Sequence, residues 1–83
     1  MIKVKRKNQQ EFTVRVEGKE YNVDLDDEYW QDLTGGKITK EGLIKKSFKF
    51  LLEREPKESI FPRFDLRIIN QYFPEFEEEI RKL

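Results

Sequence analysis

Two runs of alternating apolar and polar residues, separated by a glycine, constrain this chain more than any other feature. Apolar side chains occupy every second position of both runs, namely Phe12, Val14 and Val16, then Tyr21, Val23 and Leu25. Successive side chains of a strand point to opposite faces, so each run predicts a strand with one apolar face. Between them, Gly18-Lys19 predicts a two-residue turn. We therefore expect an antiparallel hairpin over about residues 11–25, whose apolar face must be covered.

The segments after this hairpin share a signal for the start of a helix. In each, an apolar residue precedes a good capping residue, and a second apolar residue lies four positions beyond the cap: Leu25-Asp26 with Trp30, Ile38-Thr39 with Leu43, and Phe64-Asp65 with Ile69. This spacing is typical of the hydrophobic staple, which fixes how the chain enters a helix. Apolar spacing then predicts three to four short helices over about 27–33, 40–55, 66–72 and 75–82.

The expected fold class is therefore α+β, with the N-terminal hairpin packed under these helices. The 83 residues suffice for a single small domain, residues 1–83, with one core. That core is aromatic, because the chain has 7 Phe, 3 Tyr and 1 Trp. Residues 1–8 are expected either to extend the first strand through Ile2 and Val4 or to form a flexible basic arm.

The chain contains neither histidine nor cysteine. Those side chains carry most acid–base chemistry near neutral pH, thiolate catalysis and nearly all zinc sites. The tightest group of carboxylates, Asp24 to Glu28, lies at a predicted helix start, where the helix dipole favours acids without any metal. We therefore expect no enzyme activity, no cofactor and no metal site. A carboxylate-based hydrolase would need Asp24 or Glu28 in a closed pocket.

Hydropathy predicts a protein of the cytoplasm with no membrane contact. No segment approaches the roughly 20 apolar residues that span a bilayer, and no apolar stretch follows the basic residues at the beginning of the chain. The 17 basic and 17 acidic side chains balance, so the chain as a whole has no bias towards nucleic acid.

Basic residues nevertheless gather near the start of the chain and along the predicted helix 40–55. The candidates for phosphate contacts are Lys3, Lys5, Arg6, Lys7, Arg15, Lys37, Thr39, Lys40, Lys45, Lys46 and Lys49. If they lie on one face, the protein is a small interaction module that binds nucleic acid weakly or as an accessory, with an affinity that falls steeply with salt.

The alternative is a protein–protein adaptor. Its anchors would be the aromatic residues Trp30, Phe61 and Phe73, since buried aromatic side chains dominate the energetics of many interfaces. The partner would be another protein or a second copy of the chain. Scattered lysines and a contiguous exposed apolar patch would favour this alternative.

Residues 21–52 resemble the ribbon-helix-helix DNA-binding module. The resemblance lies in a strand at Tyr21–Leu25, a short helix at Asp27–Leu33 and a longer helix at Lys40–Leu52. It implies strand pairing across a dimer and a phosphate clamp at Thr39 and Lys40.

The whole chain is also similar to a group of short, uncharacterised prokaryotic proteins. The shared phrases are Leu33-Thr34-Gly35-Gly36-Lys37-Ile38, Phe50-Leu51-Leu52-Glu53-Arg54-Glu55-Pro56 and Tyr72-Phe73-Pro74-Glu75-Phe76. This similarity implies no particular activity.

Overall fold

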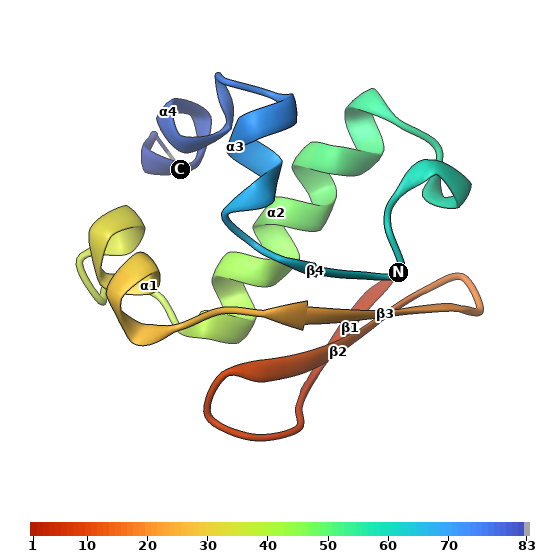
Figure 1. Ribbon diagram of the computed structural model, residues 1–83, viewed down its shortest axis with the longest axis horizontal. Helices are drawn as coiled ribbons and strands as arrows, with labels where there is room; N and C mark the ends of the chain where they lie inside the picture. The colour runs from red at the N-terminus through yellow and green to blue at the C-terminus, as the bar shows by residue number, and fades with distance from the viewer. Residues whose placement is uncertain (83) are drawn as a thin grey trace.

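The computed structural model describes residues 1–82, which form one sheet with helices on one of its faces (Figure 1). The elements in chain order are β1 (Ile2–Arg6), β2 (Glu11–Val16), β3 (Lys19–Asp24), α1 (Asp27–Thr34), α2 (Lys40–Arg54), the 3-10 helix η1 (Lys57–Ser59), β4 (Arg63–Asp65), α3 (Ile68–Tyr72) and α4 (Phe76–Arg81). The α+β prediction is confirmed.

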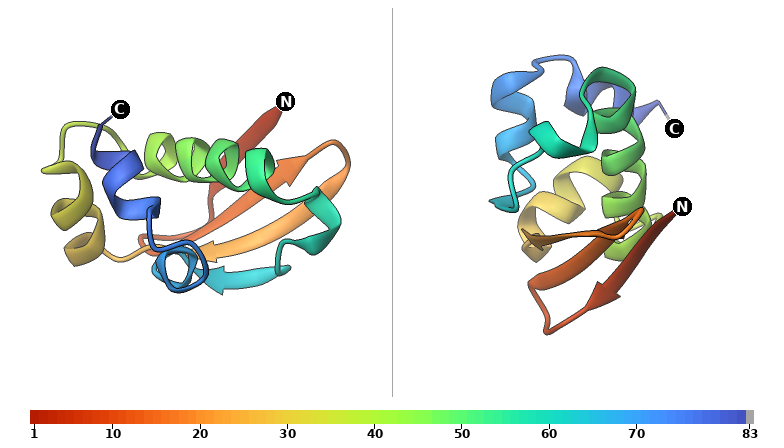
Figure 2. Two further views of the ribbon diagram at one scale, coloured as in Figure 1. Left: turned by 90° about the horizontal axis from the view of Figure 1, so that it is seen from above. Right: turned by 90° about the vertical axis from the view of Figure 1, so that its right-hand side faces the viewer.

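The four strands lie in the order β1-β2-β3-β4. The first three are antiparallel, and β4 returns parallel to β3 with Phe64 opposite Val23. Parallel neighbours need a crossover connection. Here α1, α2 and η1 provide it, and Figure 2 shows α2 lying along one face of the sheet.

The hairpin forms as expected, but its turn comes one residue earlier, at Glu17-Gly18. Both residues have positive φ, 47° and 84°, and Val16 pairs with Lys19. Positive φ at both central positions is typical of the type I′ turn, whose twist matches that of the flanking strands. The observed register places Arg15 opposite Glu20, whereas a Gly18-Lys19 turn would place Glu17 there. Like charges directly opposite each other destabilise a strand pair, so the observed register is the favourable one.

Residues 2–6 form the edge strand β1 and not a flexible arm. Ile2 and Val4 lie opposite Val16 and Val14, and both are partly buried against the core. The guanidinium of Arg6 lies 5.2 Å from the centre of the Phe12 ring. The alternation of apolar and basic residues therefore gives this segment one face that packs and one that remains in water.

The segment between α2 and α3 differs most from the prediction. The prediction places no helix or strand between residues 55 and 66, but this segment contains both η1 and β4. The predicted helix 66–72 begins only at Ile68, because the Leu66 N–H donates to the Asp24 carbonyl at 2.9 Å and so continues the sheet. The Asp65 carboxylate accepts from the Arg67 N–H at 2.9 Å and does not cap a helix in the expected way.

The first two helix starts are as predicted. The Asp26 carboxylate accepts from the Tyr29 N–H at 2.8 Å, and the Thr39 hydroxyl accepts from the Gly42 N–H at 3.0 Å. Each cap satisfies one of the N–H groups that a helix leaves without an internal partner. Gly35 ends α1 in the left-handed conformation at φ 64°.

The core lies between the sheet and the helices. Phe48 of α2 is fully buried, with its ring centre 5.2 Å from that of Tyr21 on β3 and 6.0 Å from that of Phe64 on β4. Ser47 is also buried, and its hydroxyl donates to the Leu43 carbonyl at 2.8 Å.

Within residues 1–82, no helix has the length and apolar character needed to cross a membrane. α2 lies over one face of the sheet and α1 lies beyond the ends of the strands (Figure 2). In the described part of the chain, no helix covers the other face.

Candidate functional site

The open face of the sheet carries part of the predicted basic surface. Lys3 and Lys5 lie opposite Arg15 and Thr13, and alternation along the strands directs these side chains away from the core. Lys7 comes directly after β1, and Lys3, Lys5 and Lys7 line one shallow depression on this face. Arg15 forms an ion pair with Glu20 at 3.1 Å.

Arg6 and Lys40, two of the predicted phosphate contacts, form ion pairs within the fold. Arg6 pairs with Glu41 at 3.3 Å, and this hydrogen bond lowers the pKa of the Glu41 carboxyl. Lys40 is only 5% exposed; its ammonium contacts the Asp27 carboxylate and donates to the Gln9 carbonyl at 2.9 Å.

The remaining predicted contacts belong to the helical layer. The Thr39 hydroxyl caps α2. Lys45 and Lys49 are exposed on α2, Lys46 is half-buried, and Lys37 is exposed in the loop before it. The predicted basic residues therefore divide between the outer face of the sheet, where Lys3 and Lys5 lie, and the helical layer on its inner face.

Both edges of the strand expected from the ribbon-helix-helix resemblance are occupied. Tyr21–Asp24 of β3 pairs with β2 on one side, and Asn22–Asp24 pairs with β4 on the other. Pairing of this strand across a dimer would therefore require β2 or β4 to move away.

Among the carboxylates near the start of α1, Asp26 makes contacts that stabilise the fold. Asp26 caps α1 and pairs with Arg67 at 2.7 Å. The hydrogen bond from Arg67, helped by that from the Tyr29 N–H, lowers the pKa of the Asp26 carboxyl. Asp24 lies on the open face of the sheet, and Glu28 is exposed on α1. Among residues 1–82, no group of three or more acidic side chains is arranged to hold a metal ion.

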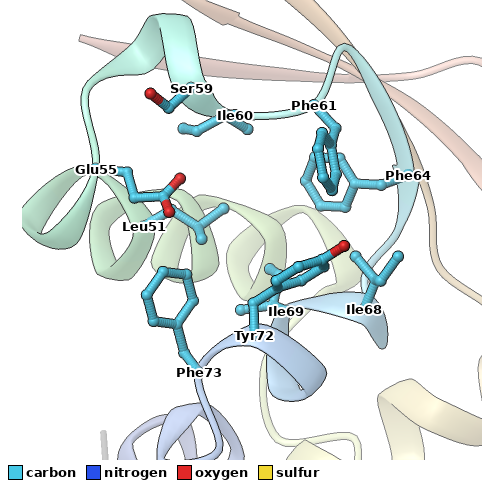
Figure 3. A pocket seen from close by; sticks show the side chains of 10 residues that line it. All are labelled: Leu51, Glu55, Ser59, Ile60, Phe61, Phe64, Ile68, Ile69, Tyr72 and Phe73. Carbon is cyan, nitrogen blue, oxygen red and sulfur yellow. The ribbon is translucent and has the colours of Figure 1, made fainter.

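The most distinctive surface feature is an apolar groove between α3, η1 and β4, with α2 beneath it (Figure 3). We call it the β4 groove, and its volume is about 220 Å³. It is lined by Leu51, Glu55, Ser59, Ile60, Phe61, Phe64, Ile68, Ile69, Tyr72 and Phe73. Leu51, Ile60, Phe64 and Ile69 are buried core residues, so the groove opens directly onto the core.

Two aromatic side chains at this groove are exposed to solvent. Phe61 is 48% exposed and Tyr72 is 60% exposed, and their rings meet edge to face with centres 5.6 Å apart. Phe61 is held outward because its neighbour Ile60 points into the core and Pro62 is fixed by the bond from the Asn22 N–H to its carbonyl. Tyr72 lies at the end of α3.

The structure thus brings together two of the three predicted aromatic anchors. Phe61 and Phe73 both line the β4 groove, and Phe73 also packs edge-on against Phe50, with ring centres 6.0 Å apart. Trp30 lies elsewhere, at the junction of α1 and α2, where its indole N–H donates to the Ile38 carbonyl at 2.7 Å. Sequence reasoning missed Tyr72, for which the available signal is its i, i+4 spacing from Ile68.

Of the described residues that line the β4 groove, Glu55 alone is charged. It follows the last turn of α2, where its backbone N–H donates to the Leu51 carbonyl at 2.8 Å. Figure 3 shows its side chain between Leu51 and Ile60. Among residues 1–82, no ion pair involves Glu55. The groove therefore combines an apolar lining with one negative charge at the end near α2.

Comparisons with models of protein families, with curated proteins and with solved structures found no match to this chain.

Proposed function

We propose that the protein is a small, non-enzymatic interaction domain of the cytoplasm that binds a segment of another protein in the β4 groove. The observation that carries this proposal is the exposed pair formed by Phe61 and Tyr72 at the rim of the groove. Apart from Met1, these are the exposed large hydrophobic residues within residues 1–82.

The size and lining of the groove support a protein ligand. Small-molecule sites generally enclose about 300–1,000 Å³. The β4 groove, at about 220 Å³, is smaller and suits individual apolar side chains. Aromatic residues that can be covered on binding contribute strongly to protein interfaces, since they bury a large area and lose little conformational entropy.

The test is selection of peptides from a random display library on the purified domain. Recovered peptides are expected to bind the unaltered protein and to lose about tenfold or more in affinity for the double variant Phe61→Ser/Tyr72→Ser, the size of effect typical of interface anchors. The matched control is Lys45→Ser/Lys49→Ser, which changes two exposed residues of α2 outside the groove. Control affinities should remain unchanged.

Both double variants should remain folded, because all four altered side chains are exposed. Circular dichroism and urea denaturation check this. Recovery of no specific peptide, or of peptides that bind the Phe61→Ser/Tyr72→Ser variant as well as the unaltered domain, would refute the groove as the binding site.

A second candidate function, nucleic-acid binding, is favoured by one observation on the opposite face of the sheet. Lys3, Lys5 and Lys7 are exposed there, and none of them forms an ion pair within residues 1–82. Three such cations could each neutralise a phosphate and release counterions.

A gel-shift titration on duplex DNA and on RNA at low salt tests this second function. The variant Lys3→Gln/Lys5→Gln/Lys7→Gln should weaken binding and flatten its salt dependence, whereas Lys45→Gln/Lys49→Gln should not. If the unaltered protein shifts neither nucleic acid at low salt, nucleic-acid binding is excluded and the peptide-binding proposal is unaffected.

A further inference from the structure

The β4 groove lies beside an open edge of the sheet. β4 is the last strand in the order, and within residues 1–82 no strand pairs with its outer side. The Pro62 carbonyl accepts from Asn22 and the Leu66 N–H donates to Asp24, so the peptide groups at even positions here face β3. By alternation, the N–H and C=O groups of Arg63 and Asp65 face away from the sheet.

The groove is next to this edge, on the helical side of the sheet. Phe64 of β4 lines the groove from its inner face, and Phe61 and Ile68 lie just before and after the strand (Figure 3). In Figure 1, β4 runs across the front of the molecule below α3. A strand added beside β4 would therefore direct every second side chain towards the groove.

The lining of the groove indicates which side chains the added strand would place there. An apolar lining accepts apolar or aromatic side chains, and Glu55 adds a negative charge at the end near α2. A lysine or arginine on the incoming segment would complement that carboxylate, which has no ion-pair partner within residues 1–82.

The opposite edge of the sheet has a different character. β1 carries Lys3, Lys5 and Arg6 within its five residues. Lysines on an edge strand discourage pairing with another chain. The two charged side chains of β4 are instead paired within the fold, Arg63 with Glu11 at 3.0 Å and Asp65 with Arg67 at 3.5 Å, and aromatic and aliphatic residues lie beside this edge.

Resting on the proposed function of the groove, we infer that the ligand is an extended segment of another protein that pairs as an added strand with β4. It places an apolar side chain in the β4 groove and a lysine or arginine near Glu55. Main-chain hydrogen bonds to Arg63 and Asp65 provide affinity, and the groove provides specificity, as in other complexes formed by strand addition.

The experiment uses a peptide recovered from the display library and hydrogen exchange of the full-length protein followed by NMR. Saturating peptide is expected to slow exchange of the Arg63 and Asp65 amides by about tenfold or more, as for other amides protected in a sheet. Two versions of the peptide, N-methylated at odd or at even positions, give a second readout. One version should lose about tenfold or more in affinity and the other should bind nearly as before, because only alternate amides of a strand face its neighbour.

The charge component is tested with Glu55→Gln and with the matched control Glu53→Gln, an exposed acid in the last turn of α2. Glu55→Gln should weaken a lysine-containing peptide by about two- to fivefold, in the range of a partly exposed ion pair, and leave its norleucine analogue unchanged. Glu53→Gln should change neither affinity.

The outcomes separate this inference from the proposed function. Peptides that need Phe61 and Tyr72 but leave the Arg63 and Asp65 amides unprotected, or that tolerate both methylation patterns, overturn strand addition and leave the groove as the site. Failure to recover any peptide overturns both. Protection of these amides that rises with protein concentration in the absence of peptide overturns the inference by showing that a second copy covers the edge.

Discussion

Asp26 shows how a single acidic residue of this chain serves the fold. Its carboxylate caps α1 through the Tyr29 N–H at 2.8 Å and pairs with Arg67 at 2.7 Å. Arg67 in turn lies over the Tyr29 ring, 4.9 Å from its centre. These contacts favour the ionised carboxylate and lower its pKa, so they stabilise the fold above the unfolded pKa of about 4 and are lost as pH falls through the lower folded pKa.

Substitutions at Asp26 should separate the cap from the charge. Asp26→Ala should lower the free energy of unfolding at pH 7 by about 1–2 kcal/mol, as at other helix caps. Asp26→Asn keeps an acceptor for the Tyr29 N–H and should lose less. Urea denaturation between pH 7 and pH 3 measures both effects. The difference between the unaltered protein and Asp26→Asn should shrink as pH falls below about 4, because Asp26 becomes protonated in the unfolded chain before it does in the folded protein. A difference independent of pH would contradict this role.

Lys40, one of the predicted phosphate contacts, shows why the surroundings of a single residue could not be predicted from the sequence. It stands among other lysines and next to a helix cap, which is the pattern of a phosphate contact. Its burial against Asp27 and the Gln9 carbonyl depends on contacts with α1 and with the β1–β2 loop, which are distant in sequence. Spacing along one helix gives no information about such partners.

At the scale of elements, local signals were predictable and non-local pairing was not. The capping residues Asp26 and Thr39 were identified because a helix start is encoded within a few residues. β4 was missed because its three residues become a strand only by pairing with β3, far back in the chain. That pairing also delays the start of α3.

The β2–β3 turn provides a test at this scale. Glu17 adopts φ 47°, a conformation that asparagine tolerates better than glutamate, and Gly18 follows it. Glu17→Asn would create the preferred Asn-Gly pair and should stabilise the protein by about 0.5–1 kcal/mol, or a few degrees in Tm. Gly18→Ala, at φ 84°, should instead destabilise it by about 1 kcal/mol.

Thermal unfolding followed by circular dichroism compares these two variants with the unaltered protein. Equal melting temperatures for all three would show that the turn does not adopt the type I′ conformation.

At the scale of the whole molecule, one aromatic residue of α2 joins the helical layer to two strands of the sheet. Phe48 joins α2 to β3 through Tyr21 and to β4 through Phe64. A domain this small, in a chain without cysteine and therefore without a disulfide, is generally stable by only about 5 kcal/mol. The stability of the protein should therefore depend strongly on the packing of Phe48 against Tyr21 and Phe64.

Phe48→Ala should lower the free energy of unfolding by about 3–5 kcal/mol, which leaves little or no folded protein. Phe61→Ala, at an exposed aromatic residue, is the matched control and should change it by less than about 1 kcal/mol. Urea denaturation measures both. A loss of similar size for the two variants would contradict the placement of Phe48 at the centre of the core.

The candidate site could be predicted only in part for a related reason. Phe61 and Phe73 were named from their chemistry, but the groove exists only where α2, η1, β4 and α3 meet. Tyr72 and Glu55 line the groove only because these four elements pack together. The predicted basic surface divides between two layers because strand and helix residues with the same charge lie on opposite faces of the sheet.

An NMR titration with a library-selected peptide is the sharpest test of whether the β4 groove is the binding surface. Signals of Phe61, Tyr72 and Ile68 should shift with a single affinity, whereas the indole N–H of Trp30 and the amides of Lys3 and Lys5 should not shift. Shifts centred on Trp30 or β1, with those of Phe61 and Tyr72 unchanged, would contradict this assignment of the binding surface.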